Sequence, residues 1–138
     1  MNAPLRIRTL TLADFHAELK CQGVSAREHI AFVCPICATV QSAQDLIDAG
    51  AGRSLETVER FLGFSCIGRF NGAGAHRKGA PAGHGCNWTL GGLFQLHDFA
   101  VIDDDDGKAH PLFRPASPAE AQSHEQAWRR RAELGVAS

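Results

Sequence analysis

Short apolar segments along the chain have the period of β-strands. Residues 5–10 alternate apolar and polar side chains, as a half-buried strand does. Residues 103–107, Asp-Asp-Asp-Asp-Gly, lie between two further segments, which predicts a hairpin with a solvated tip. The predicted strands are residues 5–10, 29–33, 64–70, 93–96, 99–102 and 110–113.

Between these segments the apolar spacing changes to that of amphipathic helices. Leu12, Phe15 and Leu19 recur on one face, and Thr11 with Asp14 gives an N-terminal capping pattern. Glycine or the loss of the apolar period ends each helix. The four predicted helices begin at Thr11, Ser42, Ser54 and Ser117 and end near Gly23, Gly50, Gly63 and Leu134.

Composition places the chain among single globular domains. It has 138 residues, of which 44% are hydrophobic and 21% charged. The net charge of -1 gives no basic excess of the kind that marks a nucleic-acid binder. The sequence shows no run long enough to span a membrane, nor an apolar signal-peptide core, which predicts a cytoplasmic protein without a membrane partner.

Four of the five cysteines have the arrangement of a metal site. Cys34 and Cys37 are separated by two residues, so that a tight turn can direct both sulfurs to one ion. Cys66 lies in a strand-like segment and Cys86 directly follows the glycine-rich segment, and both can complete the site. The fifth cysteine, Cys21, is then not a ligand. In a reducing compartment such cysteines bind zinc more often than they form disulfides. The sequence therefore predicts one zinc ion held by four thiolates.

Two alternatives remain open for this site. His76 or His84 could replace Cys66 or Cys86 as a ligand, and the thiols could be inert or a redox pair. Four sulfur ligands would leave zinc no open position for water, so the predicted site is structural and favours a protein that is not an enzyme.

Gly68, two residues after Cys66, would let the backbone curl around the sulfur of Cys66.

The elements and the cysteines together predict an α+β fold. It would contain a small antiparallel β core, a zinc-ribbon-like site of four cysteines and peripheral helices. Residues 1–115 would form the zinc-stabilised domain with a glycine-rich loop at 71–85, and residues 116–138 a C-terminal helix and tail. That helix has a thin apolar stripe of Ala121, Trp128 and Leu134, so we expect it to pack weakly or to require a partner.

One stretch beside the predicted metal is locally basic. It could contact phosphates or an acidic protein surface, although solvated charge on a surface loop explains the pattern equally well. The candidate partner-binding residues of this basic stretch are Arg53, Arg60, Arg69, Arg77 and Lys78.

The acidic hairpin tip at residues 103–107 lacks the ligand spacing of an EF-hand calcium loop.

The central part of the chain contains a specific combination of short segments: Phe32-Val-Cys-Pro-Ile-Cys37, Val40-Gln41-Ser42, Asp45, Ala49-Gly50, Gly63-Phe-Ser-Cys-Ile-Gly-Arg69, Gly85-Cys-Asn-Trp88 and Gly91-Gly-Leu-Phe94. In these segments the chain resembles a family of small, uncharacterised proteins of bacteriophages and prophages. The resemblance implies a zinc-binding site of four cysteines and a host-directed role, such as inhibition of a bacterial defence system of the anti-CRISPR kind.

Three functional hypotheses follow from the sequence. The first is a zinc-stabilised module, without enzymatic activity, that binds a host protein complex or nucleic acid. The second is a small enzyme, or an enzyme subunit, that acts on nucleic acid. The third is a structural protein that self-associates into a homo-oligomer, for which the thin stripe on the last helix would supply the contact.

Overall fold

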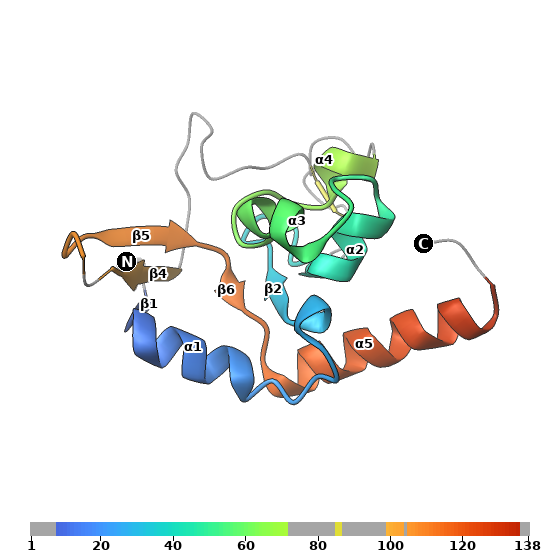
Figure 1. The fold of residues 1–138 in the computed structure, drawn as a ribbon, viewed down its shortest axis with the longest axis horizontal. Helices are drawn as coiled ribbons and strands as arrows, with labels where there is room; N and C mark the ends of the chain where they lie inside the picture. The colour runs from blue at the N-terminus through green and yellow to red at the C-terminus, as the bar shows by residue number, and fades with distance from the viewer. Residues whose placement is uncertain (1–7, 72–84, 87–98, 104, 136–138) are drawn as a thin grey trace, which may run out of the picture.

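The computed structural model has an α+β fold of two small sheets and several short helices, with one long C-terminal helix (Figure 1). This confirms the fold class predicted from the sequence. The structure describes residues 8–71, 85–86, 99–103 and 105–135.

The first sheet has the strand order β1-β4-β5. Strand β1 (Arg8–Thr11) pairs in parallel with β4 (Phe99–Ile102), which pairs antiparallel with β5 (Ala109–Leu112). The parallel pair was not predicted, because it joins two strands far apart in the sequence. Helix α1 (Leu12–Lys20) follows β1 directly, and the Thr11 side chain accepts a hydrogen bond from the backbone N–H of Asp14.

The second sheet is antiparallel and has the order β3-β2-β6. Strand β2 (Ala31–Val33) lies in the centre, between β3 (Val40–Ser42) and β6 (Arg114–Pro115). Because β2 ends immediately before Cys34, this sheet fixes where the first pair of cysteines begins.

The remaining helices begin where the capping patterns predicted. Helix α2 (Ala43–Asp48), helix α3 (Leu55–Leu62) and helix α5 (Pro118–Glu133) each start with a capping box, and α5 has proline in its first turn. The short helix α4 (Gly68–Asn71) was not predicted, and neither was the 3-10 helix η1 (Arg27–His29).

The core joins both sheets and contains the cysteines. Phe15 packs between Phe32 and Phe99, with ring centroids 6.1 and 5.9 Å away. Gln22 is fully buried and bonds across two strands, because its amide donates to the carbonyls of Ala31 and Ala116 at 2.9 and 3.1 Å. Its oxygen accepts from the Ala31 N–H at 2.9 Å. Gln22 thereby satisfies backbone groups that would otherwise be buried without partners.

Two strand predictions were wrong. Residues 64–70 do not form a strand, because the chain turns at Cys66: the Arg69 N–H donates to the Cys66 carbonyl at 3.0 Å and α4 begins at Gly68. His29 belongs to η1 and not to β2, which is shorter than predicted. Helix α1 ends at Lys20, before Gly23, which has a positive φ of 72°.

Helix α5 is attached to the body by polar contacts, contrary to the expectation of weak packing. Its apolar contribution is small: Ala121 is buried, whereas Leu134 is 72% exposed. His124 bonds to Asp45 of α2, and the Trp128 indole N–H donates to Asp48 at 2.8 Å. The buried Glu125 accepts from the Ser25 N–H at 2.9 Å. We call this set of contacts the α5 interface.

Several predictions fall on residues that the structure does not describe. They include residues 5–7 of the first strand, most of the glycine-rich loop 71–85 and the strand 93–96. The division into a domain at residues 1–115 and a helix and tail at 116–138 stays a prediction. Within the described ranges, no helix has the length and hydropathy needed to cross a bilayer.

Candidate metal centre

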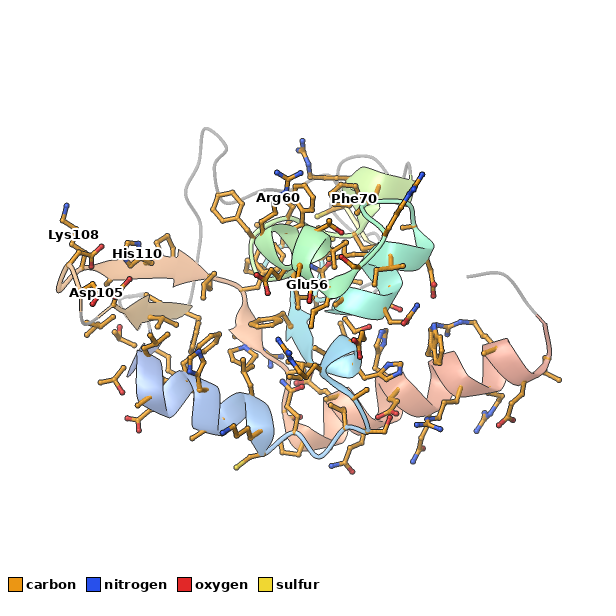
Figure 2. The ribbon with its side chains drawn as sticks, in the orientation of Figure 1. Glu56, Arg60, Phe70, Asp105, Lys108 and His110 are labelled. Carbon is orange, nitrogen blue, oxygen red and sulfur yellow. The ribbon has the colours of Figure 1, made fainter. Side chains whose placement is uncertain are left out.

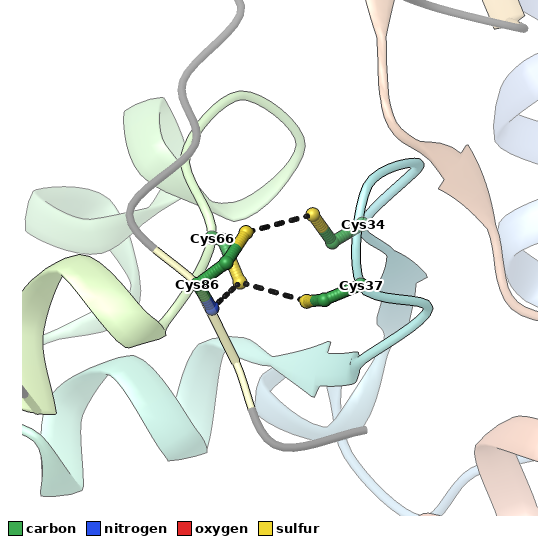
Figure 3. Close-up of side chains that lie close together, drawn as sticks. All are labelled: Cys34, Cys37, Cys66 and Cys86. Atoms are coloured by element: carbon green, nitrogen blue, oxygen red, sulfur yellow. Dashed lines mark hydrogen bonds between the residues drawn. The ribbon is translucent and has the colours of Figure 1, made fainter. Parts of the chain in front are cut away.

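Four buried cysteines come together from three parts of the chain. Cys34 and Cys37 lie in the turn between β2 and β3, Cys66 lies between α3 and α4, and Cys86 approaches from a separate segment (Figure 3). Each is at most 2% exposed. The structure therefore brings together all four cysteines that the sequence selected, whereas the fifth, Cys21, is exposed.

The spacing of the sulfurs fits a tetrahedral metal. All four Sγ atoms lie within 4.8 Å of one another; the Cys34–Cys86 pair is separated by 3.8 Å and the Cys37–Cys66 pair by 3.6 Å. A tetrahedron with metal–sulfur bonds of about 2.3 Å has edges of about 3.8 Å. A disulfide would need about 2.05 Å. The distances are thus too long for disulfides among these sulfurs, and the four cysteines could hold a metal ion.

Electrostatics at the site favour a thiolate at Cys66. The hydrogen bond from Cys34, together with those from the backbone N–H groups of Gly68 and Cys86, lowers the pKa of Cys66 to about 5 against the effect of burial. The same contact with Cys66, followed by burial, raises the pKa of Cys34. Two buried negative charges repel each other, so a bound cation is needed to keep several thiolates in this space.

The turn that carries Cys34 and Cys37 is closed by backbone hydrogen bonds. The Cys34 N–H donates to the Thr39 carbonyl at 3.0 Å, and the Ala38 N–H donates to the Cys34 carbonyl at 2.9 Å. Ala38 has a φ of 59°, which is the left-handed region that normally favours glycine. The turn is therefore held in a strained conformation that points both sulfurs the same way.

Gly68 allows the chain around Cys66 to approach Cys86. A Cβ atom at residue 68 would lie 2.2 Å from the carbonyl oxygen of Cys86 and 2.3 Å from its nitrogen. The Cys86 N–H donates to the Cys66 sulfur at 3.3 Å. The sequence predicted a role for Gly68 in curling the chain, and the structure gives the reason as close backbone contact between the two cysteine segments.

Thr39 supports two of the cysteine segments and was missed by the sequence argument. Its hydroxyl lies 2.9 Å from the Cys37 sulfur and accepts the Gly85 N–H at 2.7 Å. When Cys37 is a thiolate, the hydroxyl must donate to it, because a thiolate has no proton. Thr39 thus orients Cys37 and also holds the segment that contains Cys86.

Gln41 is the second supporting residue that was missed. It is fully buried, and its amide donates to the carbonyls of Leu62 and Ser65 at 2.8 and 2.9 Å. Its oxygen accepts from the Ile67 N–H at 2.7 Å. Gln41 therefore fixes the chain on both sides of Cys66. A glutamine at an inward position of a short strand beside Cys37 is the sequence signal that could have identified it.

The structure describes three of the five predicted partner-binding residues and neither of the alternative ligands. The alternative ligands His76 and His84, and the basic residues Arg77 and Lys78, lie outside the described residues. The basic residues that the structure describes, Arg53, Arg60 and Arg69, are all exposed.

One of these arginines, Arg60, lies over an aromatic ring. The guanidinium of Arg60 lies 4.5 Å from the ring centroid of Phe61, which is 5.0 Å from that of Phe70. Arg60 and Phe70 lie on the same side of α3 and α4 (Figure 2), and Phe64 is 36% exposed. Arginine and aromatic side chains are enriched at the centres of protein interfaces.

The acidic hairpin tip is solvated, as predicted. The Gly107 N–H donates to the Asp103 carbonyl at 2.8 Å, and His110 pairs with Asp106 at 2.8 Å, both side chains being exposed. Ligand atoms of Asp103, Asp106 and His110 lie within 4.8 Å of one another. Exposed acidic groups of this kind are common at turns without a metal, and none of these three residues is buried.

A family model matches residues 11–116, which include all four cysteines. The chain belongs to the VVA0879-like family. The family's description names no activity, so membership confirms the predicted relation to an uncharacterised family, while a phage origin stays a prediction. No curated protein and no solved structure gives a significant match. The matched part of this VVA0879-like protein ends just before α5 begins.

Proposed function

We propose that this VVA0879-like protein is a zinc-stabilised binding module without enzymatic activity. The observation that carries the proposal is the set of four buried sulfurs within 4.8 Å of one another, two pairs of which have the spacing of a tetrahedral site. Zinc and iron both accept four thiolates in this geometry, and zinc is the metal of most structural sites of this kind. Four protein ligands fill the coordination sphere and leave no place for a reacting water.

A metal in this position would stabilise the fold by joining distant segments. The four sulfurs belong to the turn after β2, the chain between α3 and α4, and the segment of Cys86, so one ion would join all three. Because the ligands are brought together only in the folded chain, the free energy of metal binding becomes free energy of folding.

Cobalt substitution tests whether the site is closed. The visible spectrum of protein with Co²⁺ in place of the native metal should show a tetrahedral site of four thiolates, and excess imidazole or azide should leave it unchanged. A spectrum that shifts with either small ligand would reveal an open position and contradict a structural role. Cys66→Ser should change the spectrum, while Cys21→Ser, which removes the exposed thiol, should not.

We propose further that the partner is a protein surface rather than nucleic acid. The net charge of -1 becomes more negative on zinc binding, since four thiolates add four negative charges and the ion only two positive ones. Such a molecule repels a phosphate backbone. The exposed Arg60 beside Phe61 and Phe70 supports a protein contact. If the protein acts in bacteria infected by phage, a host defence complex is the narrower candidate.

Charge reversal on α3 tests the partner. Immobilised protein should capture one acidic partner complex from bacterial lysate, and Arg53→Glu with Arg60→Glu should abolish the capture. Lys108→Glu, which makes the charge change of one of these substitutions at the distant hairpin tip (Figure 2), is the control. Salt-sensitive binding to labelled oligonucleotides without any protein capture would contradict the proposal and favour nucleic acid. Self-association alone, seen by light scattering, would favour the structural hypothesis.

A further inference from the structure

A groove lies between α1 and α3, and we call it the α1–α3 groove. Its volume is about 690 Å³, within the range of about 300 to 1,000 Å³ that is typical of small-molecule sites. The apolar lining includes Phe15, Leu19, Phe32, Leu55, Leu62 and Leu112.

Part of this apolar lining remains in contact with water. Leu19 of α1, Leu55 of α3 and Leu112 of β5 are only half-buried, although each packs against the main core. Covering such side chains with an apolar group is favourable by about 25 cal/mol for each Å² removed from water. The groove therefore offers binding free energy to a ligand with an apolar part.

Charged side chains form the rim of the groove, and their balance is positive. Lys20, Arg27 and Arg60 line it together with Glu56 and Glu59, which leaves one net positive charge when His16 is neutral. Arg27 contributes to lowering the pKa of Glu56, after the larger effects of the Glu56 backbone N–H and of Ser54. Among the residues described, no carboxylate forms an ion pair with Lys20, Arg27 or Arg60.

The two walls of the groove differ in charge. The wall formed by α1 contributes Phe15, His16, Leu19 and Lys20, and so contains no acidic residue. The wall formed by α3 contributes both acidic residues of the rim together with Arg60. An anionic group is therefore favoured at the α1 wall, next to Lys20, and disfavoured near Glu56 and Glu59.

We propose that the α1–α3 groove binds a small amphipathic monoanion, of the chemical class of fatty acids and other apolar carboxylates. The apolar part lies against Leu19, Leu55 and Leu62, and the carboxylate lies beside Lys20. This ligand site goes beyond the function proposed above, because it requires neither the metal's identity nor a protein partner.

Three twelve-carbon probes that differ only in their head groups test the charge selection. Dodecanoate, dodecan-1-ol and dodecylammonium are titrated into the protein as purified, below the micellar concentrations of the two ions and the solubility limit of the alcohol, with binding followed by calorimetry and by amide chemical shifts. Dodecanoate should bind up to about fivefold more tightly than dodecan-1-ol, as expected for one exposed charge pair, and dodecylammonium should bind more weakly than dodecanoate. Lys20→Glu should remove this preference or reverse it toward dodecylammonium.

Two further variants locate the site. Leu19→Trp should fill the groove and weaken all three probes, while Lys108→Glu at the hairpin tip should change none of them. Circular dichroism establishes that each variant is folded, and Lys20→Glu alters only an exposed position. Failure of dodecanoate to bind, an unchanged order of affinities in Lys20→Glu, or shifts outside the groove would overturn the proposal. So would a dimer, seen without ligand, that Leu19→Trp dissociates.

Discussion

Two segments from the second half of the chain are attached to the same body by different means. Cys86 is held at a site where four sulfurs from three segments converge, and its neighbour Gly85 bonds to Thr39. Helix α5 is instead held by separate polar contacts along its middle part, from Gln122 to Arg129. In the proposed function the first attachment depends mainly on one ion, whereas the second divides its energy among several side chains.

The difference predicts two kinds of failure. A structural metal site contributes folding energy as a unit, so the loss of one ligand weakens everything that the ion holds. The contacts of the α5 interface are individually worth about 1–3 kcal/mol where they involve buried charged groups. Losing one of them should therefore loosen α5 without unfolding the body.

The largest expected effect is the loss of a metal ligand. Cys37→Ser should lose its metal and fail to give a cooperative thermal transition, because the chain between β2 and β3 would no longer be joined to Cys66. Calorimetry and metal content measure this outcome. Cys21→Ser is the matched control, and its exposed position predicts a change within about 0.5 kcal/mol. A stable, metal-free Cys37→Ser protein would remove the distinction between the two attachments.

The two buried glutamines provide a sharper comparison, since each satisfies three backbone groups. Gln41→Ala and Gln22→Ala should both lower the free energy of unfolding by about 3 kcal/mol or more, because buried carbonyl and N–H groups lose their partners. Only Gln41→Ala should also weaken metal binding, by about 10–100-fold, because Gln41 fixes the chain beside Cys66. Competition with a chelator measures this affinity. Equal metal affinities in both variants would contradict the supporting role.

A smaller effect is expected at the α5 interface. Glu125→Gln should cost about 1–3 kcal/mol at pH 7, because the buried carboxylate accepts bonds from Ser25 and Arg129. The fluorescence of Trp128, in a Trp88→Phe background, reports whether α5 leaves the body. Gln122→Ala, at an exposed position of the same helix, gives the smaller reference effect.

The pH dependence of Glu125→Gln separates the α5 interface from the cysteine site. Burial opposes the ionisation of Glu125, but hydrogen bonds from Ser25 and Arg129 hold its pKa at about 2, below its usual 4.5. A lowered pKa stabilises the fold above pH 4.5 and stops doing so as pH falls toward 2. The difference between wild type and Glu125→Gln should therefore stay constant from about pH 8 to 5. Metal retention should fall over that range as thiolates gain protons, and the opposite pattern would contradict the assignment.

The smallest effect is expected at Ala38, in the turn that carries Cys34 and Cys37. Ala38→Gly should raise the free energy of unfolding by less than about 1 kcal/mol, because glycine adopts a φ of 59° without strain but gains freedom in the unfolded chain. Ala38→Val should instead destabilise the protein, since a branched side chain is strained there. Denaturant unfolding of metal-loaded protein compares the two, and a more stable Ala38→Val would show that the turn is not strained.

Local patterns in the sequence were sufficient for most helices and for the cysteine cluster. Capping residues such as Ser42 and Ser117 act on backbone groups a few residues away, so their effect can be predicted without the fold. The Cys34 and Cys37 spacing is likewise local, and metal geometry limits what the remaining cysteines can do.

The failures have a common cause in contacts between distant residues. Residues 64–70 alternate like a strand, but the sulfur of Cys66 and the close contact of Gly68 with Cys86 turn the chain into α4. The thin apolar stripe of α5 predicted weak packing, because no pattern relates His124 to Asp45 or Glu125 to Ser25 across the chain. Polar contacts of this kind become visible only in the structure.

The measurement that tests the account most directly is the metal content of the protein as purified. Elemental analysis by mass spectrometry should find one zinc ion for each chain of wild type, and a strong chelator that removes it should abolish the cooperative thermal transition. Iron in place of zinc would keep the proposed geometry and would correct the assignment of the metal. A protein that holds no metal and unfolds identically with and without chelator would contradict the central claim.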